Sequence, residues 1–177
     1  MIKVTSNVDK VLSQLKAYQQ RTEEKEKRLL VRLHEIGVDV ASAKLMTISY
    51  DGDHTTEVLT EPEWISDTAL ALSVQGDAIT FIEFGTGTFY GDMHEKAGEF
   101  GFTRGGYGQH RGLNPPWTFT ADGRPISLTT GTARIVRKKN GGYAYKTYGN
   151  PPNRVLYGTS QELKQKITDI AREVWND

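Results

Sequence analysis

The sequence of 177 residues contains no cysteine. A chain without cysteine has no disulfide framework, no thiolate ligand for a metal and no cysteine nucleophile. Long apolar runs are also missing, because stretches such as residues 69–72 are far too short to cross a bilayer. The first residues, Met1 to Val4, include no charged segment followed by an apolar run, so we expect no signal peptide and no membrane association.

The chain also lacks net charge, because 22 basic residues balance 22 acidic ones. The two signs are nevertheless separated along the sequence. Residues 51–100 hold eleven Asp and Glu against one Lys, a sum of −10, and residues 101–150 hold eight Lys and Arg against one Asp, a sum of +7. The two stretches either neutralise each other within one fold or form two faces that meet between copies of the chain.

The basic stretch 134–139 lies close to Tyr143 and Tyr145, a combination that can contact nucleic acid. The alternative is a hairpin tip that its charges keep soluble. Zero net charge argues against a dedicated DNA-binding protein. Weak contacts suit a channel through which DNA passes, because tight phosphate binding would stall the passage.

A long amphipathic helix is predicted over residues 6–46. Its apolar residues form two stripes at helical spacing, first Val8, Val11, Leu12 and Leu15, then Leu29, Leu33, Ile36 and Val40. The polar stretch 19–28 between the stripes contains i,i+4 charge pairs in the favourable order and can remain helical. A continuous helix here would be roughly 60 Å long, which exceeds the diameter of a domain of this size. The helix therefore either breaks near Thr22 or projects at one end and finds a partner.

The middle of the chain is predicted to form a small sheet. Residues 47–62 are interpreted as a loop, residues 68–74 and 78–84 as two strands around Gly76, and the Asp122-Gly123 and Asn140-Gly141 pairs as hairpin turns. The segment 88–114 is rich in glycine and has few aliphatic side chains to anchor it. We therefore expect this segment to be mobile in the isolated protein.

A second helix is predicted over residues 159–175. Thr159 and Glu162 have the spacing of a capping box. The apolar stripe of this helix consists of Leu163, Ile167, Ile170, Ala171 and Val174. Together the patterns predict an α+β fold: a long N-terminal helix, a small mostly antiparallel sheet and a C-terminal helix packed on the sheet. One domain spans residues 1–177, with an extended loop and hairpin insertion at about 88–150.

No constellation of catalytic or metal-binding residues stands out in the sequence. The histidines, which are His34, His54, His94 and His110, have no second histidine at a metal-ligand spacing. Asp92, His94 and Glu95 can reach a common cation, but a solvated polar loop is the stronger interpretation. The acidic middle offers several carboxylates for a glycosidase pair, and nothing singles out two of them: Glu57, Glu61, Glu63, Asp67 and Glu83. We expect no catalytic residue, no metal, no cofactor and no enzymatic activity.

Residues 81–87 read FIEFGTG and resemble a known signature. It is the hydrophobic-E-F-G-T signature of phage tail-component proteins, or head–tail joining proteins, of long-tailed bacteriophages. In that family a long N-terminal helix precedes a strand that carries the signature, and a helix closes the chain. This sequence has the same order of elements. Residues 153–157, which lead into residues 160–163, also resemble the start of the C-terminal helix in the longer Gram-positive-type members.

The resemblance implies a structural protein of the virion. Such a protein belongs to the phage neck or tail end and joins or completes the tail for attachment to the head. The resemblance further implies a homo-oligomeric ring around the DNA channel, with other phage neck and tail proteins as partners and DNA passing without specific binding. The protein would be made in the cytoplasm of the bacterial host and reside in the virion.

On a strand, the two aromatic residues of the signature, Phe81 and Phe84, would point to opposite faces, one toward the core and one toward an interface. Gly85 and Gly87 would permit a sharp exit into the long loop. Glu83 would bind backbone amides of that loop or a basic residue of a neighbour. The predicted subunit-interface residues are Glu83, Phe84, Gly85, Thr86, Arg134, Arg137 and Lys138.

A rival interpretation is a β-rich tail module that binds a host surface or a carbohydrate. Its platform would consist of aromatic loop residues, namely Phe89, Tyr90, Tyr107 and Trp117. The two interpretations predict different gene positions, because a joining protein should be encoded between head and tail genes and a receptor binder near the tail-fibre end. An enzyme ranks third.

Overall fold

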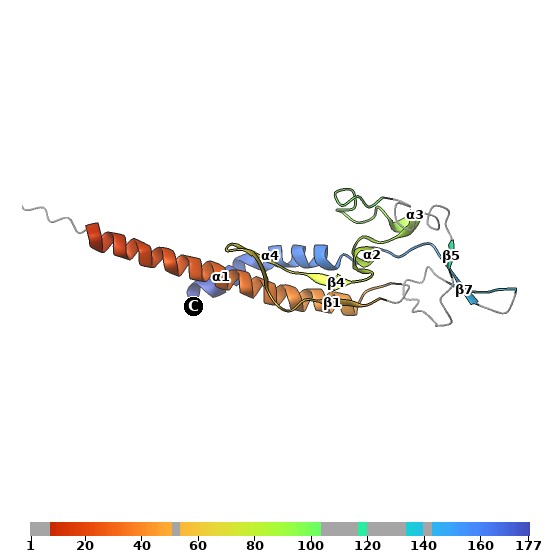
Figure 1. The fold of residues 1–177 in the computed structure, drawn as a ribbon, viewed down its shortest axis with the longest axis horizontal. Coiled ribbons are helices and arrows are strands. Elements are labelled where there is room, and N and C mark those ends of the chain that lie inside the picture. Colours follow the sequence, from red (N-terminus) through yellow and green to blue (C-terminus); the bar gives the residue numbers. More distant parts are fainter. Residues whose placement is uncertain (1–7, 51–53, 104–116, 120–133, 140–142) are drawn as a thin grey trace, which may run out of the picture.

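The computed structural model describes residues 8–50, 54–103, 117–119, 134–139 and 143–177. Two long helices lie side by side, and short strands and helices surround the C-terminal end of the first one (Figure 1). The helices are α1 (Val8–Met46), α2 (Ile79–Phe84), α3 (Gly87–Tyr90) and α4 (Val155–Asn176). The strands are β1 (Thr56–Val58), β2 (Glu63–Ser66), β3 (Ala69–Ala71), β4 (Val74–Gly76), β5 (Trp117–Phe119), β6 (Arg134–Arg137) and β7 (Tyr143–Thr147). The predicted α+β class, with a long helix at each end of the chain and small antiparallel sheets between them, is confirmed.

The strands form three small antiparallel sheets. β1 pairs with β4, β2 pairs with β3, and the third sheet has the order β5-β7-β6. The predicted hairpin about residues 140–141 is confirmed, because β6 and β7 pair in the register Arg137↔Tyr143. β5 pairs with β7 in the register Trp117↔Thr147, and the turn predicted at residues 122–123 lies outside the described residues.

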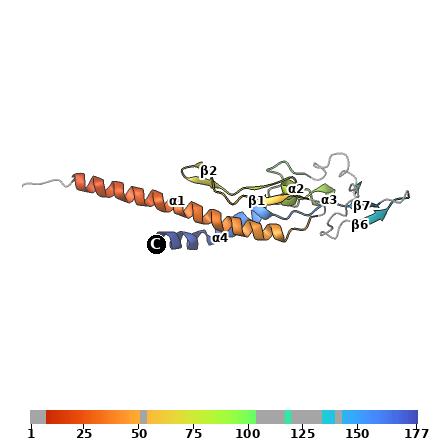
Figure 2. The ribbon, with the colours of Figure 1, turned by 60° about the horizontal axis from the view of Figure 1, so that its bottom comes forward.

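Helix α1 is continuous, so the predicted alternative of a break near Thr22 is wrong. At that point Thr22 donates its hydroxyl hydrogen to the Tyr18 carbonyl oxygen at 3.0 Å, and Gln19 donates to Glu23 at 2.8 Å. The other alternative holds: one end of the helix projects. Lys25 and Arg28 contact the end of α4 at Trp175 and Asp177, and the residues of α1 before them, 8–24, extend beyond α4 and stand clear of the rest of the described chain (Figures 1 and 2). We call residues 8–24 the α1 overhang.

Helix α4 runs antiparallel to α1 and packs along it. Lys44 and Glu162 approach to 3.8 Å near one end of the contact, and at the other end Lys25 donates to the carbonyl oxygen of Trp175 at 2.7 Å. Gly37 allows the close approach, since a Cβ there would lie 3.3 Å from the Leu163 side chain. The main partner of the C-terminal helix is thus α1 and not a sheet.

The core lies where α1, α2 and the start of α4 meet. Its buried members are Ala41, Ala78, Ile82 and Val155, with Leu45, Ile48, Tyr50, Val58 and Leu72 packed around them. Among the described residues, no helix combines the length and the apolar character that crossing a bilayer requires.

The strand predicted over residues 78–84 is wrong, because residues 79–84 form helix α2. The run is apolar and β-branched without alternation, and its last residues Ile82, Glu83 and Phe84 are all buried. A run this short has no periodicity that separates a strand from a helix. As a consequence, Phe81 and Phe84 are three residues apart on a helix and do not point to opposite faces of a strand.

The prediction of a loop over residues 47–62 missed β1, which pairs with β4. The segment 88–114 is described as far as Thr103, and this part begins with α3. There Ala97 and Phe102 are buried against Phe84, and the Phe84 and Phe102 rings stack with centroids 4.2 Å apart. The first part of the segment therefore has apolar anchors, and the remainder lies outside the described residues.

Candidate functional site

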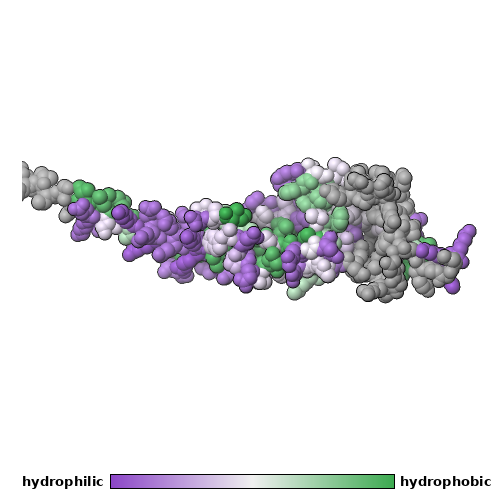
Figure 3. Space-filling view, in the orientation of Figure 1, coloured by the Kyte–Doolittle hydropathy of each residue, from purple (hydrophilic) through white to green (hydrophobic). Residues whose placement is uncertain are grey.

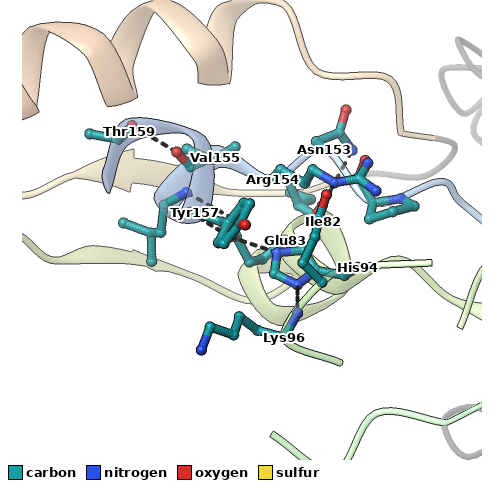
Figure 4. A network of polar contacts seen from close by, with 12 residues as sticks. Ile82, Glu83, His94, Lys96, Asn153, Arg154, Val155, Tyr157 and Thr159 are labelled. Carbon is teal, nitrogen blue, oxygen red and sulfur yellow. Dashed lines mark hydrogen bonds and ion pairs between the residues drawn. The ribbon is translucent and has the colours of Figure 1, made fainter. Parts of the chain in front are cut away.

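The signature residue Glu83 lies at the N-terminus of α4. Its side chain is buried, and the residue is only 5% exposed. One carboxylate oxygen accepts a hydrogen bond from the Leu156 amide and the other from the Tyr157 amide, both at 2.8 Å (Figure 4). The first amides of a helix have no partner within the helix, and a negative charge is favourable at that end. Glu83 therefore caps α4 from a distant part of the chain.

This capping replaces the predicted capping box, which is wrong. α4 begins at Val155, four residues before Thr159. Thr159 is fully buried inside the helix, and its hydroxyl donates to the Val155 carbonyl oxygen at 2.7 Å. The helix starts three residues after Pro151 and Pro152 end the preceding segment.

His94 supports the Glu83 carboxylate. Its Nδ1 accepts a hydrogen bond from the Lys96 amide at 3.0 Å, so the neutral ring carries its proton on Nε2. That nitrogen lies 3.3 Å from a Glu83 oxygen and donates to it. The ring of His94 also packs edge-on against Phe84 and Tyr157, with centroids 4.6 and 5.2 Å apart. Both ring nitrogens are therefore used within the protein.

The segment before α4 also binds the end of α2, through backbone hydrogen bonds. Asn153 donates its backbone amide to the Ile82 carbonyl oxygen at 2.8 Å, and the Arg154 amide donates to the Glu83 carbonyl oxygen at 3.3 Å. The Asn153 side chain accepts from the Ser49 amide at 2.7 Å and donates to the Ser49 carbonyl oxygen at 3.0 Å. Asn153 thus connects the ends of α1, α2 and α4.

A second set of bonds joins the residues that follow Phe84 to the residues that precede Pro151. Thr86 donates its amide to the Asn150 carbonyl oxygen, and its hydroxyl oxygen accepts from the Asn150 amide, both at 2.9 Å. The two segments that carry the family resemblance, residues 81–87 and 153–157, therefore bind each other. We call residues 81–87 together with residues 149–157 the helix junction.

Arg154 binds the loop that contains Met93 and Glu95 to the junction. It adopts the left-handed conformation, with φ 54° and ψ 42°. Its guanidinium donates to Glu95 at 2.8 Å and to the Met93 carbonyl oxygen at 2.6 Å. The hydrogen bond from Arg154 to Glu95 is the main cause that lowers the pKa of the Glu95 carboxyl group.

Acidification should therefore destabilise the fold. A pKa that is lower in the folded than in the unfolded chain gives stability above the unfolded value, about 4.3 for glutamate, and this stability is lost as the pH falls through the folded value. The same direction holds for Asp77, whose pKa the Thr55 amide lowers most, and for Glu162, whose pKa Lys166 lowers most. We expect the melting temperature to fall between about pH 5 and pH 3, and to fall less steeply in Glu95→Gln. Parallel melting curves for both proteins would contradict the role of Glu95.

An apolar cavity borders the junction. The cavity has a volume of about 390 Å³ and is lined mainly by apolar side chains that include Val74, Ile79, Phe100 and Leu156. Glu83 and His94 border the cavity, but the carboxylate oxygens bind helix amides and both histidine nitrogens have partners. Among the described residues, no three His, Asp or Glu side chains gather around a common metal position. The arrangement holds two helices together.

The predicted interface residues separate into two groups. Glu83, Phe84 and Gly85 are buried within the protomer and Thr86 is half-buried, so in this structure their contacts are intramolecular. The basic residues Arg134, Arg137 and Lys138 are exposed on β6 and directly after it. Their role at a subunit interface stays a prediction. Of the proposed aromatic platform, Tyr90 closes α3, and the side chains of Phe89, Tyr107 and Trp117 lie outside the described residues.

The exposed apolar residues gather in a few places. On the α1 overhang they are Val8, Val11, Leu12, Leu15 and Tyr18, between 50% and 72% exposed. Figure 3 shows apolar surface at this free end of α1, followed by a hydrophilic stretch. Two further pairs are Trp64 and Ile65 on β2, and Ile135 and Val136 on β6. These surfaces are the candidate assembly sites.

The chain matches no protein-family model, no curated protein and no solved structure.

Proposed function

We propose that this protein is a structural component of a phage neck or tail end that joins or completes the tail through assembly. The observation that carries the proposal is the α1 overhang. Its apolar residues Val8, Val11, Leu12 and Leu15 are spaced i, i+3, i+4 and i+7, the spacing by which an amphipathic helix binds a groove. In the described protomer they have no covering element.

The energy of this surface supports an assembly role. Covering five half-exposed apolar side chains is worth on the order of 5 kcal/mol before the entropy of association is subtracted. Contiguous apolar surface of this kind marks a site of protein–protein contact. A rigid helix that projects from a small body can reach a neighbouring subunit that the body itself does not touch.

The element order and the junction support the phage assignment. The order of elements in the resemblance is present in the fold: a long helix, then residues 81–87, then a closing helix. Here the signature fixes α4 against the end of α1, because Glu83 caps α4 and Asn153 binds Ser49. In the proposed function this junction sets the direction of the overhang, and the assembled copies surround DNA that passes without specific binding.

A particle assay tests the proposal. Interruption of the gene in the phage that carries it should yield filled heads and separate tails in electron micrographs of the lysate, and the intact gene supplied in trans should restore complete particles. An antibody label should mark the junction of head and tail in the restored particles. Complete particles without the protein, or a label at the fibre end, would exclude the joining role.

The double variant Leu12→Ser/Leu15→Ser should prevent assembly without unfolding the protomer. Both side chains are half-exposed in the protomer, so we expect little change in the melting temperature. The mass of the assembled species, measured by light scattering or native mass spectrometry, should fall, and particle completion should be lost.

The matched control is Lys10→Ser/Ala17→Ser, two exposed positions on the opposite face of the same helix. This control should assemble like the wild type. If the leucine variant also assembles and completes particles like the wild type, the overhang is not an assembly surface.

A further inference from the structure

Two hairpins of opposite charge are exposed on this protein. The first consists of β2 and the residues beside it up to the start of β3, and every residue from 61 to 68 is exposed. It carries the acids Glu61, Glu63 and Asp67, and Trp64 and Ile65 lie between them. Ile65 is 71% exposed. We call residues 61–68 the acidic hairpin; it stands away from α1 in Figure 2.

The second surface consists of β6 and the two residues after it. Residues 134–139 are all exposed and carry Arg134, Arg137, Lys138 and Lys139. Ile135 and Val136 lie between the charges, and Ile135 is 56% exposed. We call residues 134–139 the basic edge. Among the described strands, β6 pairs with β7 alone and forms one edge of its sheet.

The two surfaces match each other in three respects. Their charges are opposite, each has two adjacent exposed apolar residues between its charges, and each is a strand with an edge that no other described strand occupies. An apolar centre with a charged rim is the usual composition of a specific protein–protein contact. A free strand edge adds backbone hydrogen-bonding groups to such a contact.

The two surfaces do not meet within one protomer. The acidic hairpin lies beside the middle of α1, and β6 lies at the far end of the molecule (Figure 2). No ion pair joins the three acids or the four basic residues to any described residue. The charges of these two surfaces are therefore not neutralised by ion pairs inside the part of the chain that the structure describes.

We propose that the acidic hairpin of one copy docks on the basic edge of a second copy of this chain. The inference deepens the proposed assembly function and rests on it. The contact joins two different surfaces, so each copy uses its hairpin toward one neighbour and its edge toward the other. Such a head-to-tail contact closes into a ring when the rotation between copies permits it.

Charge reversal on each side tests the contact. The edge variant Arg134→Glu/Arg137→Glu/Lys138→Glu should weaken self-association at least about tenfold, because two acidic surfaces then face each other. The hairpin variant Glu61→Lys/Glu63→Lys/Asp67→Lys should weaken it to a similar degree. The chain that carries both sets has surfaces that match again and should recover self-association. Association of the wild type should also weaken at about 1 M salt, where the screening length is about 3 Å.

All six substituted side chains are exposed in the wild type, so each variant should keep the wild-type circular dichroism spectrum and melting temperature. The matched control is Lys166→Glu/Arg172→Glu on exposed positions of α4, which should leave self-association unchanged. The proposal is overturned if the edge variant self-associates as strongly as the wild type. It is also overturned if the edge variant and the hairpin variant are both weakened and the chain that carries both sets does not recover self-association.

The absence of cysteine allows a direct second measurement. A single chain with Ile65→Cys and Val136→Cys contains no other thiol. Mild oxidation of this variant should produce a ladder of cross-linked copies, and each single-cysteine variant should stop at the dimer or remain monomeric. A double variant without a ladder contradicts the hairpin contact even where particles are completed normally. The opposite combination is also informative. If the variant forms a ladder but the phage completes its particles without this protein, the hairpin contact stands and the joining function is overturned.

Discussion

Replacement of Glu83 with alanine is expected to lower the free energy of unfolding by about 3–5 kcal/mol. The carboxylate binds two amides at the start of α4, and each hydrogen bond to a charged group contributes about 1.5–3 kcal/mol. Without it, the Leu156 and Tyr157 amides and the His94 ring lose a partner in a part-buried site where water does not replace it freely. Denaturant titration followed by circular dichroism measures this loss.

Two further variants separate the possible roles of Glu83. Glu83→Gln keeps the size of the side chain and one accepting oxygen, but its amide nitrogen would face a backbone N–H group, so it should recover only part of the stability. Glu24→Ala, on the exposed overhang, should stay within about 0.5 kcal/mol of the wild type. A stable Glu83→Ala protomer that no longer assembles would instead show that Glu83 acts between subunits, as the sequence first predicted.

The long helix was predictable because its signals are local. The stripe that begins at Val8 and the stripe that begins at Leu29 follow helical spacing, and favourable charge pairs bridge the polar stretch between them. The sequence did not decide whether the helix breaks or projects, because the answer depends on where α4 ends. The structure places Asp177 beside Arg28, at 3.4 Å, and thereby leaves the first turns of α1 uncovered.

Residues 79–84 show why the signature was assigned to the wrong kind of element. Their helix is a turn and a half long, too short for periodicity, and its stability comes from burial of Ile82 and from the junction that binds its last carbonyl groups. The bonds from Asn153 and Arg154 join residues about seventy positions apart. A local pattern does not contain this information.

The start of α4 was misplaced for a related reason. Thr159 and Glu162 have the spacing of a capping box, but the group that caps the helix is Glu83. A local signal did exist, because Asn153 follows two prolines and asparagine is common where a helix begins. The roles of His94 and Arg154 were not visible in the sequence at all, since their partners are far away along the chain.

Two glycines of the junction, Gly85 and Gly149, allow its rigidity to be tested. Gly85 and Gly149 have φ values of 79° and 109°, a region in which side chains are strained. A Cβ at Gly149 would overlap the Thr86 carbonyl oxygen, and one at Gly85 would lie 2.9 Å from the Asn150 carbonyl oxygen. Because both obstacles are backbone atoms, they cannot move aside without breaking the bonds between Thr86 and Asn150.

The chain supplies matched controls that separate strain from overlap. Gly101 has φ 75° but open space around its Cβ position, so Gly101→Ala should cost only the conformational strain of about 1–2 kcal/mol. Gly98 has open space and no positive φ, so Gly98→Ala should be neutral or slightly stabilising.

Gly85→Ala and Gly149→Ala should therefore be destabilised by about 3 kcal/mol or more, which is more than strain alone accounts for. Denaturant titrations of the four variants give the order directly. Because the junction orients α4 and with it the overhang, the two junction variants should also assemble poorly even where they remain folded. Equal stability of Gly149→Ala and Gly101→Ala would mean that residues 86 and 149 separate at little cost, and a junction that yields in this way does not set the direction of α1.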